Sequence, residues 1–354
     1  MVNSLWLSKP KTEFLFICLP PFFCLLLILL LPSIFQQPQD VNTLWWLALV
    51  LVIDVSHVYS TLYRTYFDKQ QWQLHKPLLI AIPILCFLSS IVLFQLGSDI
   101  FWRVMAYIAV FHFIRQQYGF VKVYQRKESP HFLHNMEIVT VYASMLYPLL
   151  YWHCYGPFQF TWFIPNDFLF LKNHILEVIG RWVYLAILFV YLITWIRFTW
   201  LKKSFNLPVL LVIVGTALNW YFGIVYFKSD LAFTLLNVIC HGIPYITIVW
   251  LFTQKSPVDG SKSKYSLQRL LLRKYGLLLF LFIPLALGYL EEGFWDAFVW
   301  KDHPEVFAWF YALPQETISS IIMLIVPLLI TPQLTHYVLD GFIWKVSKGH
   351  VRIN

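Results

Sequence analysis

Apolar stretches of about 20 residues, each long enough to cross a lipid bilayer as a helix, fill almost the whole chain. About ten of them can be placed, at 14–35, 43–66, 77–97, 100–123, 135–155, 175–200, 206–227, 231–253, 271–290 and 307–330. A helical extension is expected to follow at 333–346.

Composition supports this division into membrane spans. Only 12% of the 354 residues are charged, whereas a soluble domain has about 25%. We therefore predict an all-α, polytopic integral membrane protein, a helical bundle of about ten transmembrane helices. The chain shows no repeat and no soluble insertion, so residues 1–354 are expected to form a single multi-pass domain.

The charged residues alternate between the two sides of the predicted spans. If the N-terminus is cytoplasmic, the cytoplasmic segments hold 20 of the 26 lysines and arginines. The predicted outer loop 291–305 is acidic instead, with Glu291, Glu292, Asp296, Asp302 and Glu305. Because positive residues crowd the cytoplasmic loops of membrane proteins, both chain ends are expected in the cytoplasm, with the protein in the cell (inner) membrane. The net charge of +8 then needs no nucleic-acid partner.

Four histidines lie deep within predicted spans, where ionisable residues are costly and mark functional sites by default. They are His57, His112, His241 and His336, on the second, fourth, eighth and tenth spans or their ends. All four spans run from the outer to the inner side. At a rise of about 1.5 Å per residue, the histidines fall between the midplane and the cytoplasmic surface. A common depth predicts one shared site.

Each of these histidines has a carboxylate or an amide one helical turn away. The pairs are Asp54 with His57, His112 with Gln116, Asn237 with His241, and His336 with Asp340. Residues at these spacings share a face of a helix, and a metal-bound histidine usually donates its second N–H to such a partner. We therefore predict a metal site of the four histidines, with Asp54 and Asp340 as further ligands or as partners of the ligands.

Arg115 is expected to belong to the same site. It lies within the fourth span beside the predicted face of His112. A buried arginine needs a partner, and Asp54 and Asp340 are the candidates. Arg115 and Gln116 would then polarise the site or hold a polar group of the substrate.

The ligand types restrict the metal. Imidazole and carboxylate suit iron, zinc or copper. The five cysteines are scattered and contain no CxxC pair, so they predict neither a disulfide framework nor a thiolate site. Iron with positions open for oxygen is the preferred prediction, and zinc, copper and haem are the alternatives.

The four histidine segments resemble two groups of membrane metalloenzymes. One is the Brp/Blh-type carotene-cleaving oxygenases, in which a few intramembrane histidines and an aspartate hold iron. The other, more distant, is the histidine-box desaturases and hydroxylases, whose HxxxH and HxxHH boxes are absent here; His131 and His134 form only an HxxH in a loop. The resemblance implies an iron-dependent oxidoreductase, a mono-iron or di-iron oxygenase. Its lipid or isoprenoid substrate would enter from the bilayer at the cytoplasmic side.

Three other functions fit the same residues. Intramembrane Asp, Glu, His and Arg also build proton relays, as in a proton-coupled transporter. Histidine pairs on different helices can ligate haem in an electron-transfer protein. Polar side chains can also join helices in a purely structural multi-pass protein. The oligomeric state and any electron donor remain open at this point.

Overall fold

The computed structural model describes residues 5–37, 41–126, 128, 131–156, 158, 160–203, 205–255, 267–314 and 321–344. Within these ranges the chain is mostly helical and contains no strand, which confirms the all-α prediction. Seven helical segments are long and apolar enough to cross a membrane: Thr43–Arg64, Lys69–Gln95, His174–Lys202, Leu207–Tyr226, Asp230–Lys255, Gly276–Trp300 and Ile322–Ile343. The pair Pro10–Cys18 and Pro20–Leu30, bent by 49°, adds an eighth if it forms one span.

Two further predicted spans correspond to long helices of more polar composition. They are α7 (Ser98–Gln125) and α8 (Phe132–Tyr155), of 28 and 24 residues. Both are long enough to cross a bilayer, but neither is among the segments that are also apolar enough. The fold is therefore a polytopic helical bundle, and the number of ten spans stays a prediction.

The last long helix lies further along the chain than the sequence predicts. In place of a span at 307–330, the structure has α14 (Pro304–Phe307), the 3₁₀ turn η7 (Phe310–Ala312) and then α16 (Ile322–Ile343). Phe307 and Phe310 made the segment look like part of a span, but they pack with Ala297 in a small buried core. The helix continues through Pro327 and Pro332, so His336 lies in its body and not in an extension.

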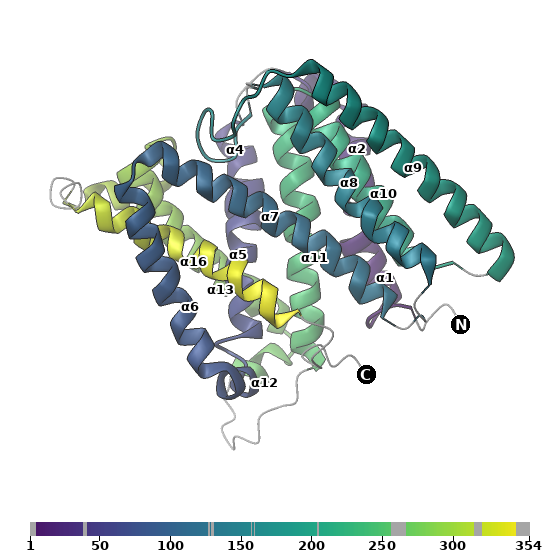
Figure 1. Ribbon diagram of the computed structural model, residues 1–354. Coiled ribbons are helices and arrows are strands. Elements are labelled where there is room, and N and C mark those ends of the chain that lie inside the picture. The colour runs from purple at the N-terminus through teal and green to yellow at the C-terminus, as the bar shows by residue number, and fades with distance from the viewer. Residues whose placement is uncertain are drawn as a thin grey trace. The chain divides into compact units, whose positions relative to one another are not determined.

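The chain divides into two compact units, to both of which α7 and α11 (Asp230–Lys255) contribute. Unit 1 comprises Met1–Val41, Met105–Pro244 and Trp344–Asn354. In it α8 packs against α9 (His174–Lys202) and α10 (Leu207–Trp220), and α10 packs against α2 (Pro20–Leu30). Figure 1 shows α8 and α9 side by side. An aromatic core that includes Trp152, Phe160 and Trp220 fills this unit.

Unit 2 comprises Asn42–Val104 and Tyr245–Ile343. Its most extensive helix contact joins α6 (Lys69–Gln95) and α16, which lie next to each other in Figure 1. Helix α13 (Gly276–Trp295) packs against the segment Leu47–Ser60. Gly288 permits a close approach there, because a Cβ at this position would lie 3.1 Å from Cγ1 of Val55. The prediction of a single multi-pass domain is not tested by this division.

Candidate metal centre

An irregular helix positions Asp54 and His57 in unit 2. The span Thr43–Arg64 begins as α4 (Thr43–Trp46), widens into the π-helix η3 (Leu47–Val55), returns to an α-helix in α5 (Ser56–Ser60) and tightens into the 3₁₀ turn η4 (Thr61–Arg64). π-Helical turns are rare and occur frequently at functional sites. Asp54 is the next-to-last residue of the π-helix and His57 lies in the first turn after it, with Asp54 Oδ1 3.5 Å from His57 Nδ1.

The imidazoles of His57 and His336 form a buried pair in unit 2. Their ring centroids lie 4.9 Å apart at an interplanar angle of 79°, and one ring nitrogen of each lies within 4.8 Å of the other. The Tyr245 ring packs edge-on against both, at 5.6 Å from His57 and 5.0 Å from His336. The two histidines are 2% and 1% exposed, so both rings are shielded from solvent.

A chain of hydrogen bonds determines which nitrogen of His336 carries the proton. Asp340 Oδ1 accepts a hydrogen bond of 2.6 Å from the Tyr245 hydroxyl. The Tyr245 oxygen lies 2.9 Å from Thr61 Oγ1, which in turn lies 2.7 Å from His336 Nδ1. Because Tyr245 gives its only proton to Asp340, Thr61 must donate to Tyr245 and therefore accepts from His336. Nδ1 of His336 is the protonated nitrogen, and Nε2 carries the lone pair that a metal would bind.

A second buried histidine pair lies in unit 1. His112 on α7 and His241 on α11 have ring centroids 5.0 Å apart at an interplanar angle of 81°, and a ring nitrogen of each lies within 4.8 Å of the other. Phe113 stacks on the His241 ring at 3.7 Å and 10°. This stacking holds the plane of His241. The two histidines are 3% and 1% exposed.

The amide side chains one turn from this pair, Gln116 and Asn237, donate hydrogen bonds to backbone carbonyl oxygens, and their own oxygens remain free to accept. Gln116 Nε2 donates to the carbonyl oxygen of His241 at 2.9 Å, and Asn237 Nδ2 donates to the carbonyl oxygen of Phe233 at 2.8 Å. Neither amide oxygen accepts a hydrogen bond from the imidazole one turn away, which differs from the pairing that the spacing predicts. Gln116 Oε1 and Asn237 Oδ1 are buried and have no hydrogen-bond partner among the described residues. Buried acceptors of this kind suit the protons of a water or of an imidazole held by a metal.

The expectation of a buried Arg115 is wrong. Arg115 is exposed, its Nη1 donates to the Tyr142 hydroxyl at 3.1 Å, and its guanidinium lies 4.4 Å from the ring centroid of Tyr118. A phenol and an aromatic face satisfy the cation at this exposed position. Arg115 therefore needs no carboxylate, and we assign it no role at the site.

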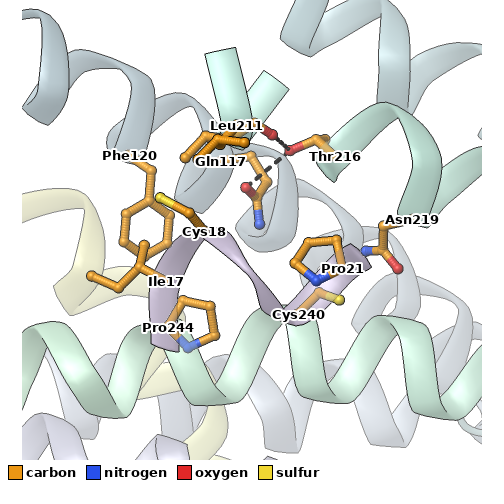
Figure 2. Close-up of a pocket in the computed structure, with 11 residues that line it drawn as sticks. Ile17, Cys18, Pro21, Gln117, Phe120, Leu211, Thr216, Asn219, Cys240 and Pro244 are labelled. Atoms are coloured by element: carbon orange, nitrogen blue, oxygen red, sulfur yellow. Dashed lines mark hydrogen bonds between the residues drawn. The ribbon is translucent and has the colours of Figure 1, made fainter. Parts of the chain in front are cut away.

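A small pocket in unit 1 borders α11 at Cys240, the residue before His241 in the chain (Figure 2). Cys240 and Pro244 line one wall, and Gln117 and Thr216, joined by a hydrogen bond of 3.1 Å, line another. Cys240 and Pro244 are one turn apart and so share a face of α11. His241 follows on the adjacent face, and the pocket is distinct from the histidine pair.

Thr61 and Tyr245 are the residues that sequence reasoning missed. Their spacing could have indicated both as partners of the histidines, because Thr61 lies four residues after His57 and Tyr245 lies four residues after His241. A hydroxyl one turn from a buried histidine can bond as well as a carboxylate can. The predicted partner Asp340 lies 3.8 Å from His336 Nδ1, and hydrogen bonds connect it to His336 through these two hydroxyls.

The buried histidines could hold a metal ion, because each pair offers two imidazole ligands. No protein-family model, curated protein or solved structure matches the chain. The resemblance to carotene-cleaving oxygenases and desaturases therefore stays a prediction.

Proposed function

We propose that His57, His112, His241 and His336 bind one metal ion, and that this ion is iron. The protein would then be a metal-dependent membrane oxidoreductase that acts on a lipid or isoprenoid substrate at the cytoplasmic side. The observation that carries the proposal is the pair of buried imidazoles in each unit. Ionisable residues in such surroundings are costly, and they are retained where they serve a site.

Helix α11 carries a residue of the histidine pair in unit 1 and a residue that contacts the pair in unit 2. This helix carries His241 in unit 1 and, one turn later, Tyr245 in unit 2. Residues four apart share a face of a helix, and the Tyr245 ring contacts both histidines of the second pair. Together, the two pairs would supply four imidazole ligands.

The surrounding residues orient the ligands and keep water away. Bound iron with open coordination positions would supply redox chemistry with oxygen. The hydrogen bonds that link Asp340, Tyr245 and Thr61 would keep the proton of His336 on Nδ1. Asp54 would lie beside Nδ1 of His57. An apolar substrate would reach the site from the bilayer, since the described chain contains no soluble domain.

Metal analysis of the full chain tests the proposal. The protein would be purified in detergent without oxygen and its metals quantified by plasma mass spectrometry. We expect about one iron per chain, because buried neutral imidazoles bind such ions tightly. A Soret band in the visible spectrum would show haem instead. Preparations without stoichiometric iron, zinc or copper would overturn the proposal.

The Thr61 hydroxyl offers a test of the hydrogen-bonded row. Thr61→Val keeps the shape of the side chain but breaks the link between His336 and Tyr245. Loss of such an outer partner lowers metal affinity about 10–100-fold, and we expect a decrease in this range by competition with a chelator. Thr61→Ser keeps the hydroxyl and should bind metal as the parent chain does. Equal affinity in Thr61→Val and the parent would contradict the role of Thr61.

A proton-coupled transporter is the second candidate, supported by carboxylates within the apolar spans of unit 2. The Tyr59 hydroxyl donates to Glu291, which also accepts from Trp295 Nε1 at 3.2 Å. Side chains of this kind can relay protons. Proton-coupled uptake into vesicles that Asp54→Asn abolishes, in a chain that binds no metal, would favour this function.

A further inference from the structure

A second cluster of metal-binding side chains lies where α7 leads into α8, within unit 1. Glu128, His131 and His134 are spaced three residues apart, and one ligand atom of each lies within 4.8 Å of the other two. This cluster, the α8 entry cluster, is separate in sequence from the four deep histidines. Under the predicted orientation it lies on the cytoplasmic side.

The distances within the α8 entry cluster approach those of a coordination shell. Glu128 Oε2 lies 2.9 Å from His134 Nε2 and 3.9 Å from His131 Nε2. Two ligand atoms that are each about 2.0–2.1 Å from a tetrahedral zinc ion lie about 3.3 Å apart. The observed separations bracket this value, so small rotations of the side chains would bring all three ligands onto one ion.

The local fold places His131 for a role other than helix capping. His131 occupies the N-cap position of α8 with extended backbone angles, but its side chain makes no capping hydrogen bond. A side-chain oxygen from Ser, Thr, Asp or Asn is favoured at this position. The imidazole instead packs with its centroid 3.7 Å from that of His134 and 4.3 Å from that of Phe198 on α9. Phe198 therefore holds His131 against His134.

Hydrogen bonding alone does not account for the cluster. The bond between Glu128 and His134 satisfies those two side chains. His131 Nδ1 is buried and has no hydrogen-bond partner in the part of the chain that the structure describes. The Glu128–His134 hydrogen bond therefore does not explain why the His131 imidazole lies against this pair.

We propose that Glu128, His131 and His134 bind a zinc-class divalent ion, with water in the fourth position. Two histidines and a glutamate with one open position form a known ligand set of zinc. The ion would stabilise the connection between α7 and α8. Gln125 at the end of α7 already bonds to Glu137 at 2.6 Å and to the His134 carbonyl at 3.4 Å, and the ion would reinforce this link. The site is independent of the proposed oxidoreductase function.

Zinc titration of the full chain in detergent tests this site. Metal would be removed with a chelator, and zinc alone would then be added in competition with a chromophoric chelator. His134→Gln keeps a donor for Glu128 but removes the ligand nitrogen. We expect the number of zinc equivalents bound to fall by one, or the affinity of that equivalent to fall at least about 100-fold, since even outer partners cost 10–100-fold. Glu128→Gln should have a similar effect.

The control is His174→Gln, at a side chain that is 71% exposed and far along the chain from the cluster. This variant should bind as many zinc equivalents as the parent. Far-UV circular dichroism and gel filtration would show that each variant is folded, and cobalt in place of zinc should give visible bands in the parent that His134→Gln lacks. Zinc binding unchanged in both folded variants of the cluster would overturn the proposal. Changes at His336 should leave this equivalent intact, so the failure of either proposal can be recognised separately.

Discussion

Replacing His336 by asparagine is expected to lower the metal affinity of the site proposed at the four buried histidines at least about 100-fold, more than the 10–100-fold lost with an outer partner. The amide nitrogen of asparagine can take the place of Nδ1 and donate to Thr61, which now accepts from His336 at 2.7 Å. Nothing in asparagine replaces Nε2. The hydrogen-bonded row should therefore survive while the ligand is lost. Iron content after purification and a chelator competition would measure the change.

The matched control for this variant is His174→Asn, which changes an exposed histidine outside both pairs. It should keep the iron content of the parent chain. A thermal unfolding curve of the metal-free proteins would show whether His336→Asn is as stable as the parent without metal. If the folded His336→Asn chain retained its iron, His336 would not be a ligand, and the proposed centre would have to be abandoned.

Substituting Gly293 by alanine should destabilise the fold by about 1–3 kcal/mol, the usual cost of overpacking a filled core. A Cβ at this position would lie 2.3 Å, 2.4 Å and 2.6 Å from three atoms of the Phe310 ring. Phe310 is only 1% exposed and packs with Phe307 and Ala297, so its ring has little room to move. We expect a lower melting temperature in detergent, measured by intrinsic fluorescence.

Gly341→Ala is the control for the effect of alanine in a helix. Gly341 lies in α16, and a Cβ there would meet no atom within 4 Å. Alanine favours a helix over glycine by about 1 kcal/mol, so this variant should be as stable as the parent or slightly more stable. A Gly293→Ala chain that melts at the same temperature as Gly341→Ala would contradict the packing described for Phe310.

Apolar runs predicted most of the fold because a span must be apolar along its length. The prediction failed at 307–330, where Phe307 and Phe310 are apolar for another reason: they fill a small core beside Ala297. Hydropathy does not distinguish a ring that packs on a neighbouring turn from one that faces lipid. The observed helix, α16, continues through Pro327 and Pro332 to Ile343, beyond the predicted end at residue 330.

The sequence indicated the buried histidines more completely than it indicated the side chains that bond to them. Depth and one-turn spacing select His57 and His336, which pair in unit 2, and His112 and His241, which pair in unit 1. The same spacing failed for Arg115, because a side chain three residues from His112 can still turn to the exposed face and bind Tyr142. Which polar group reaches which ring depends on tertiary packing, and spacing along one helix does not contain that information.

The row from His336 through Thr61 and Tyr245 to Asp340 can also carry charge. If each hydrogen moves one place along its own bond, a proton leaves the imidazole and another arrives on the carboxylate, although no heavy atom changes position. Positive charge that builds up on the His336 ring would thus be cancelled at Asp340 without any contribution from bulk water. A metal centre at the buried histidines would in this way have a counter-ion, Asp340, that one concerted proton transfer along the row can neutralise.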